Sequence, residues 1–251
     1  MKIAVLLLFM ANILSAGDVP APDWANIEFP SELRQGPVEN WRDGNSVKYG
    51  LTSGMRLQQV YSSESFAKIA SQGGWIDGFV LQADRVWKGS IQRDLKGIQI
   101  FMGYTFLDPK ALNSDFASNR TGEMMEMRSN DDITPLEIAS DGRQPLGPAV
   151  VLGFNGRGFF YDPSRGNLVI DIIPTAGFGI PLDYQTDGKG EFGSVFADFG
   201  FKGYPDSGEV SAGGFVTSLR INRIPEPSVV GLAALGGAAL LAASRQRKSN
   251  P

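Results

Sequence analysis

The middle of the chain consists of short segments in which apolar residues alternate with others, and glycine and proline separate each segment from the next. The clearest is 98–106, where every second residue is apolar or aromatic, as expected of a strand with one buried face. The segments 168–172 and 215–222 alternate in a similar way. Outside the two ends, no run of ten or more residues keeps a helical period. This pattern restricts the chain to an all-β fold.

Five more segments have strand patterns and are followed by turn residues: 55–61, 75–82, 149–154, 158–161 and 191–199. Short strands with regular turn signals favour a single β-sandwich or jelly-roll-like domain over an α/β fold. We expect this domain to span residues 31–224, after a proline-rich, extended lead at 18–30. The stretch 108–148 is weakly patterned and is predicted to be a long loop, which is either functional or mobile.

The N-terminus has the three parts of a secretory signal peptide, which we predict over residues 1–17. Lys2 supplies the positive start, 3–14 is an apolar stretch too short for a permanent membrane span, and Ser15-Ala16-Gly17 is a small-residue cleavage site. Cleavage is expected after Ala16 or Gly17. The chain is therefore predicted to be exported, with the Sec translocon as its partner.

The C-terminus joins a proline-containing triplet, an apolar run at 229–243 and a basic end: Pro225-Glu226-Pro227, then Arg245, Arg247 and Lys248. As a helix, the run would be about 22 Å long, whereas a bilayer core is about 30 Å thick. Its many alanines and glycines make it only weakly hydrophobic. We predict a short transmembrane helix of marginal stability, with the basic end in the cytoplasm and the domain outside.

This tail resembles the PEP-CTERM sorting signal of Gram-negative bacteria in its triplet, its short apolar helix and its basic end. The resemblance implies that an exosortase-type processing enzyme in the inner membrane recognises the tail. It also implies a protein that is transiently anchored in the membrane and then held at the cell surface or in the extracellular matrix. The alternative is an ordinary tail anchor in which the triplet has no role.

Three segments of the domain are similar to a β-rich ectodomain that recurs in PEP-CTERM proteins: 56–61, 98–100 and 161–172. The resemblance implies a fold and no known activity. The longest of the three also has a physical interpretation. Asp162 and Pro163 are typical of the start of a turn, and Gly166-Asn167 are suited to unusual backbone angles before an alternating strand. Asp162 is therefore predicted to begin a turn rather than to bind a ligand.

Composition narrows the chemistry open to the domain. The chain has no cysteine and no histidine, and so lacks disulfides, the commonest zinc ligand and the usual catalytic base. Residues 18–224 include 19 basic and 26 acidic residues, a net charge of −7. This balance argues against nucleic acid and anionic lipid as partners. A glycoside hydrolase with two opposed carboxylates stays open as an enzyme class, although the sequence does not identify the pair.

One acidic segment is a candidate Ca²⁺ site. Asp183, Asp187 and Glu191 lie in a glycine-rich stretch and could supply the oxygen ligands that Ca²⁺ prefers. Their spacing is not that of a calcium-binding loop with an acid at every second position. A solvated acidic loop is the alternative, and no other cofactor is expected.

The tryptophans are candidates for stacking on sugar rings: Trp24, Trp41, Trp75 and Trp87. Arg85 and Lys88 lie close to Trp87 in sequence. We therefore predict that Trp87 is at the surface and is the carbohydrate contact. Trp75 lies within a strand pattern, and we predict that it packs in the core.

Three functions remain open on the sequence alone. The leading one is an exported, non-enzymatic β-sandwich protein with a structural or adhesive role at the cell surface or in the matrix. The alternative is a carbohydrate-binding module that engages exopolysaccharide. The third is a secreted hydrolase that uses a carboxylate pair.

The sorting interpretation predicts the effect of changing Pro225-Glu226-Pro227 to three alanines. The altered chain is expected to stay unprocessed in the membrane of cells that contain an exosortase, because the recognition element is lost. Mass spectrometry of the mature protein and cell fractionation measure this. The same mature mass and location for the variant and the wild type would refute the prediction.

Overall fold

The computed structural model describes one region of the chain, at residues 24–29, 54–67, 70–83, 88–141, 149–154, 156–176, 182, 184–186, 190–197, 206–215 and 217–223. These residues fall within one compact unit, Trp24–Arg223. The predicted signal peptide and sorting tail lie outside the described residues, and so do Trp41, Trp87, Asp183 and Asp187.

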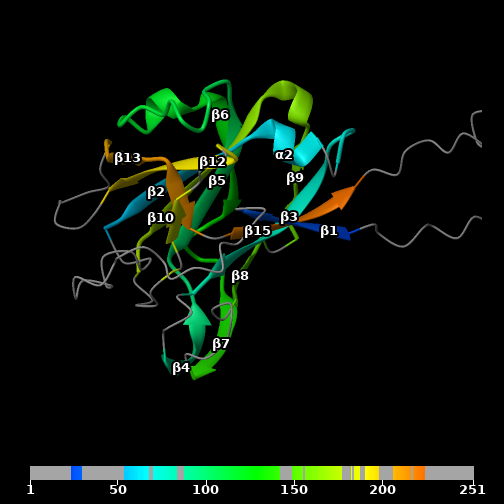
Figure 1. The fold of residues 1–251 in the computed structure, drawn as a ribbon. Coiled ribbons are helices and arrows are strands. Elements are labelled where there is room, and N and C mark those ends of the chain that lie inside the picture. The colour runs from blue at the N-terminus through cyan, green and yellow to red at the C-terminus, as the bar shows by residue number, and fades with distance from the viewer. Residues whose placement is uncertain are drawn as a thin grey trace, which may run out of the picture. The chain divides into compact units, whose positions relative to one another are not determined.

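The described residues form antiparallel sheets with few helices, which confirms the predicted all-β class (Figure 1). A five-stranded sheet contains β1 (Trp24–Phe29), β15 (Thr217–Arg223), β3 (Gly74–Gln82) and β8 (Ala149–Gly153) in that order, with β9 (Phe159–Tyr161) also paired to β3. A six-stranded sheet has the order β13 (Glu209–Ser211), β12 (Phe192–Ala197), β2 (Arg56–Tyr61), β10 (Asn167–Pro174), β5 (Ile98–Thr105) and β6 (Thr121–Arg128).

Two strand pairs and three short helical segments complete the described elements: β4 (Lys88–Leu95) with β7 (Thr134–Asp141), β11 (Tyr184–Thr186) with β14 (Gly213–Phe215), α2 (Ser63–Ala67), η2 (Ala117–Asn119) and η3 (Pro163–Arg165). Most paired strands are far apart in sequence, because the chain passes repeatedly from one sheet to the other. The arrangement therefore depends on long-range pairing more than on hairpins.

The two sheets bury their alternating apolar residues in one shared core. In β10, Leu168, Ile170 and Ile172 face the core, as the alternation predicted, and in β15 Leu219 and Ile221 do the same. Each of these side chains is at most 1% exposed. Burial of this apolar surface from both sheets is the main stabilisation of the fold.

Polar side chains also connect the sheets through this core. The side-chain amide of Gln59 in β2 donates to the Tyr61 hydroxyl (2.8 Å) and accepts from the Phe215 backbone N–H (2.8 Å). The Thr217 hydroxyl donates to the same Tyr61 oxygen (3.1 Å). Burial raises the pKa of Tyr61, so the phenol stays neutral and can take part in these bonds. The bridge ties β2 to the chain that enters β15.

The outer face of the six-stranded sheet is covered by the segment that follows β5. Leu112 and Phe116 from this segment pack on Val60, Val169 and Val195 and form a second, smaller apolar cluster. The sequence prediction of one loop over 108–148 was wrong in part, because this stretch contains β6 and β7. The side chains of β6 are largely exposed and its pairing with β5 is irregular, so β6 has no clear alternation. β7 does alternate, since Leu136 and Ile138 are buried and Glu137 is exposed, but two apolar residues make only a short pattern.

The first and last described strands lie side by side (Figure 1), and Trp24 is in register with Asn222. The sequence prediction placed residues 18–30 in a lead outside the domain. The pairing of β1 with β15 instead brings Trp24–Phe29 into the five-stranded sheet as an edge strand. The register partners of β1 run from Asn222 for Trp24 to Thr217 for Phe29, which is 222 − 24 = 198 to 217 − 29 = 188 residues away, so this pairing cannot be recognised from local composition.

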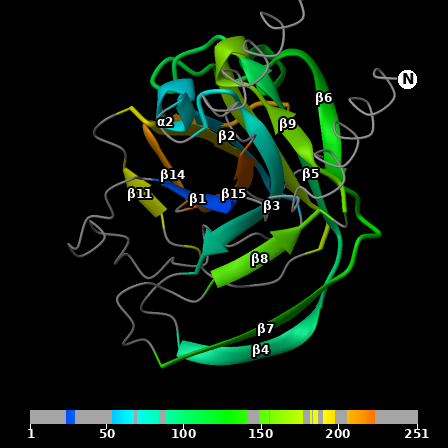
Figure 2. The same cartoon turned by 90° about the vertical axis from the view of Figure 1, so that its right-hand side faces the viewer.

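A buried arginine fixes the base of the β4–β7 pair, which Figure 2 shows as a long ribbon set apart from β3 and β8. Arg128 is fully buried. It donates to the Thr134 hydroxyl (2.7 Å) and to three carbonyl oxygens, those of Leu95 (2.9 Å), Asp132 (2.7 Å) and Gly153 (3.1 Å). Burial lowers the pKa of Arg128, and the nearby charge of Asp132 opposes this effect. One guanidinium thus joins β4, β6, β7 and the end of β8.

Replacing Arg128 with methionine is expected to lower the free energy of unfolding by about 3 kcal/mol, because four oxygen atoms lose a charged donor. Urea denaturation measures this. Arg120 is exposed and serves as the control, since its replacement by methionine is expected to change stability by less than about 0.5 kcal/mol. Equal effects of the two changes would contradict this role for Arg128.

Candidate functional site

Trp75 in β3 is exposed, with 49% of its surface accessible. The prediction that it packs in the core was wrong. A period of two places Trp75 in phase with the buried Phe79 and Leu81, but Asp77 is an extra residue where β3 pairs with β15. This β-bulge shifts the phase, so that Ile76 faces the core and Trp75 faces outward.

Neighbouring residues hold the Trp75 ring in place. Phe160 in β9 is its register partner, and the two rings meet edge to face with their centroids 5.3 Å apart. A Cβ atom added to Gly158 would lie 3.0 Å from the Trp75 ring, so the indole passes close to that backbone. The ring is therefore packed on part of its surface and open to solvent on the rest.

Polar groups lie beside this aromatic pair on the outer face of the same sheet. Asn222 is the register partner of Trp75 in β15, and Trp24 of β1 occupies the next position in that row. In the next row, Arg220 forms a bidentate ion pair with Asp77, with nitrogen–oxygen distances of 2.7 and 3.1 Å. The two groups neutralise each other and hold their planes in a fixed orientation.

Two glycines occupy adjacent positions next to these groups; the Arg220 guanidinium lies over Gly78, and the surface at Gly153 is open. Gly78 is in register with Arg220 on one side and with Gly153 on the other. A Cβ added at Gly153 would meet no heavy atom of the described residues within 4 Å. Val151, which is 52% exposed, lies two residues along β8. We call the surface made by Trp75, Asp77, Val151, Gly153, Phe160, Arg220 and Asn222 the Trp75 face.

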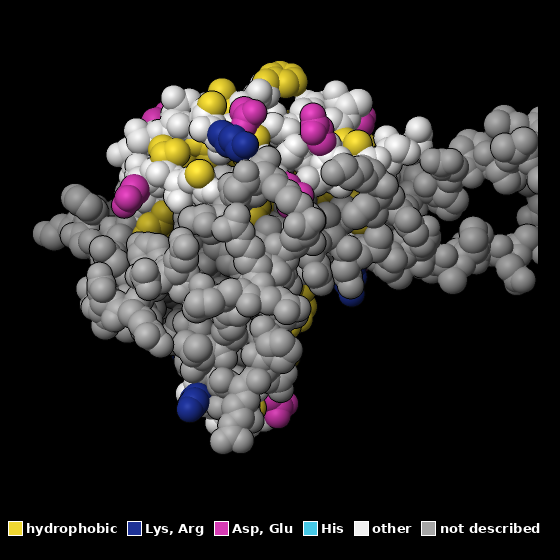
Figure 3. Space-filling model, viewed as in Figure 1, with side chains coloured by type: hydrophobic (Ala, Val, Ile, Leu, Met, Phe, Trp, Pro, Cys, Tyr) yellow, Lys and Arg dark blue, Asp and Glu magenta, His cyan; other side chains and the backbone are white. Residues whose placement is uncertain are grey.

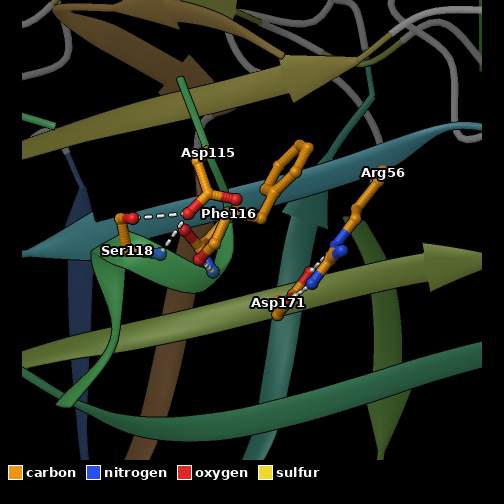
Figure 4. A network of polar contacts seen from close by, with 6 residues as sticks. Arg56, Asp115, Phe116, Ser118 and Asp171 are labelled. Carbon is orange, nitrogen blue, oxygen red and sulfur yellow. Dashed lines mark hydrogen bonds and ion pairs between the residues drawn. The ribbon is translucent and has the colours of Figure 1, made fainter. Parts of the chain in front are cut away.

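A polar network lies on the outer side of the six-stranded sheet (Figure 4). The Arg56 guanidinium donates to both carboxylate oxygens of Asp171, at 3.0 and 2.6 Å, and the Phe116 ring covers it at 4.4 Å. Asp115 accepts from the backbone N–H (2.9 Å) and the hydroxyl of Ser118. Each carboxylate thus has its own partners. This network attaches the covering segment to the sheet and leaves Asp171 only 1% exposed.

The carboxylates with shifted pKa values in the described region give no support to an acid catalyst. The Ser118 hydroxyl lowers the pKa of Asp115, and the Ser164 side chain lowers the pKa of Asp162. A general acid in a glycoside hydrolase needs a shift in the opposite direction. On the face drawn in Figure 3, acidic side chains are scattered among uncharged ones.

The predicted calcium site is only partly described. Asp183 and Asp187 lie outside the described residues, while the Glu191 carbonyl accepts from the backbone N–H of Ser62 (2.7 Å). The described residues contain no group of three or more side chains suited to hold a metal ion. In the same part of the chain, no helix is long and apolar enough to cross a membrane.

Asp162 begins a turn, as the sequence predicted. Its carboxylate accepts from the backbone N–H (2.9 Å) and the hydroxyl (2.7 Å) of Ser164, and Pro163 opens η3. Gly166 ends the turn with a φ of +125°, and a Cβ there would lie 2.7 Å from the Thr105 carbonyl. Asn167, which was predicted to share the unusual backbone, is instead the first residue of β10, and its side-chain amide donates to the Leu107 carbonyl (2.8 Å).

The sequence patterns did not predict that the residues of the Trp75 face form one surface. They placed Arg220 and Asn222 on one side of their strand, but their neighbours Asp77, Phe160 and Val151 come from three other segments. The alternation in 215–222 was the available signal for Arg220 and Asn222. The bulge in β3 concealed the outward orientation of Trp75. Comparisons with protein-family models, with curated proteins and with solved structures found no match to this chain.

The lowered pKa of Asp162 predicts a pH-dependent contribution to stability. Because the folded-state pKa lies below the unfolded value of about 3.9, the stabilisation is complete above the unfolded pKa and is lost as pH falls through the folded one. The stability difference between the wild type and Asp162→Ala should therefore shrink in acid. Urea denaturation between pH 7 and the lowest pH at which the protein is folded measures it.

The control is Asp94→Ala, which removes an exposed carboxylate from β4 and corrects for the loss of one surface charge. A difference between wild type and Asp162→Ala that stays constant over the whole pH range would exclude the carboxylate as the stabilising group.

Proposed function

We propose that this chain is an exported cell-surface or extracellular-matrix protein whose domain is a non-enzymatic adhesive module. The N-terminal signal pattern and the tail with Pro225-Glu226-Pro227 support export, sorting by an exosortase-type enzyme and transient anchoring in the membrane. Both features come from the sequence. The observation that carries the adhesive role is the Trp75 face, an exposed aromatic surface on a hydrogen-bonded sheet.

We also propose that the domain is a β-sandwich of the jelly-roll-like kind. Two sheets whose inward residues belong to one apolar cluster support the sandwich. The path of the chain supports the finer class, since β2, β3, β5 and β8 alternate between the sheets. In such a domain the outer face of a sheet is a rigid platform, and side chains on it keep a fixed spacing.

An adhesive role suits this surface better than a hydrolytic one. Aromatic side chains that are partly packed and partly exposed contribute strongly to binding, because little conformational entropy is lost when they are covered. Asp77 is the acidic side chain of the Trp75 face, and Arg220 neutralises it. A hydrolase would need a second carboxylate placed across a cleft. The proposed adhesion needs only the exposed surface.

The proposed function predicts the behaviour of cells that produce the chain together with an exosortase. The chain should be accessible to protease added outside the cells, and cells with Trp75→Ala should retain clearly less extracellular matrix than the wild type. Trp75 lies outside the core, so the altered chain is expected to reach the surface in equal amount. Matrix retention is measured by staining after washing, at matched surface levels.

Phe106→Ala provides the matched control, because Phe106 is 75% exposed and lies after β5 in the other sheet. Loss of matrix with both variants would indicate a general effect of surface aromatic residues. Equal retention by wild type, Trp75→Ala and Phe106→Ala would overturn the adhesive role of the Trp75 face.

A further inference from the structure

The Trp75 face joins an apolar ring with fixed hydrogen-bonding groups, and this combination suits a sugar. One side of a pyranose ring carries apolar C–H bonds with a slight positive charge, and the face of an indole is electron-rich. Trp75 is 49% exposed, while its edge-to-face contact with Phe160 holds the ring. A pyranose stacked on the indole would remove apolar surface from water at a small cost in side-chain entropy.

The polar groups of the face lie within reach of such a sugar. Asn222 is on the neighbouring strand, about 4.8 Å away in the direction of the sheet hydrogen bonds, and Arg220 is one row further, about 7 Å along the strand. The amide of Asn222 and the ion pair of Arg220 with Asp77 offer donors and acceptors side by side. Sugar hydroxyls need this mixture, because each one donates and accepts.

Charge selects among polysaccharides. The Arg220–Asp77 pair is neutral as a unit, and the region 18–224 carries a net charge of −7. A polymer of uronic acids or sulfated sugars would be repelled by the domain, and Arg220, the cation among the described residues of the Trp75 face, is already paired with Asp77. The electrostatics of the surface are complementary to an uncharged chain.

The open surface at Gly153 favours an extended ligand. The Arg220 guanidinium lies over Gly78, 3.7 Å from where a Cβ would be, whereas a Cβ at the neighbouring Gly153 would meet no described atom within 4 Å. A single sugar on an open surface buries little area, whereas small ligands are normally bound in concave sites. A polymer can lie along the row and contact several groups together.

We infer that the Trp75 face binds a neutral polysaccharide, with one pyranose stacked on Trp75 and hydroxyls of the same or the next sugar bonded to Asn222, Asp77 and Arg220. This inference rests on the proposed adhesive function and names the class of its ligand. It also replaces Trp87, which lies outside the described residues, with Trp75 as the principal carbohydrate contact.

The test is affinity electrophoresis of the full chain in detergent through gels that contain a neutral polysaccharide. The probes are soluble β-1,3-glucan, xyloglucan, galactomannan and dextran, with alginate as the anionic counterpart. The wild type should be retarded by at least one neutral probe and not by alginate alone. Trp75→Ala should weaken binding about tenfold or more, Trp75→Phe should weaken it less, and Asn222→Ala should weaken it about threefold to tenfold.

Two controls keep the result specific to this face. Phe106→Ala should bind as the wild type does, and thermal unfolding should confirm that Trp75→Ala is folded. Binding should change little between 50 and 500 mM salt, because the ligand is uncharged. A strong loss with salt, or binding to alginate alone, would overturn the inference.

The outcomes separate this inference from the proposed function. If no neutral probe binds and Trp75→Ala cells still lose matrix, the adhesive role stands and the ligand class is wrong. Binding to phosphatidylethanolamine–phosphatidylglycerol vesicles that depends on Trp75, without binding to any glycan, would also overturn it and point to a lipid surface. If a glycan binds equally to wild type and Trp75→Ala, the Trp75 face is not the site.

Discussion

Contact between the two sheets is the constraint on which the rest of the structure depends, and Gln59 helps to specify it. Apolar packing stabilises the core but is not directional, so several offsets of one sheet on the other would bury similar area. The bonds from Gln59 to Phe215 and Tyr61, with Thr217 as a further donor to Tyr61, favour one offset. Since most paired strands are distant in sequence, this specification matters more here than in a chain of hairpins.

The same strand that receives this bridge also builds the candidate site. In β15, Leu219 and Ile221 face the core, and Arg220 and Asn222 lie on the opposite face of the strand. Because the packed core holds the backbone of β15 in place, it also holds the positions of Arg220 and Asn222. The Trp75 face therefore needs no loop to order it before a ligand binds. Arg128 and the Arg56–Asp171 pair have a different role, because their partners belong to the fold and they attach the β4–β7 pair and the covering segment.

Local patterns predicted much of the framework. β5, which has one buried face, was found because every second residue is apolar, and β10 was found from Leu168, Ile170 and Ile172, although both of its faces are buried. Asp162 was identified as a turn residue from its chemistry. β6 was missed because most of its side chains are exposed and its pairing is irregular, whereas β1 and β7 have only short alternations and depend on partners elsewhere in the chain. The Trp75 face was missed for the same reason, since its members come from β3, β8, β9 and β15.

The sequence by itself determined the all-β class, the position of the central strands and the turn at Asp162, because each follows from the period and the backbone preferences of neighbouring residues. Only the tertiary structure decided which way Trp75 faces. A single extra residue, Asp77, shifts the phase of β3 against β15, and a shift of one residue moves every preceding side chain to the opposite face. That shift turns a predicted core tryptophan into the centre of the candidate binding surface.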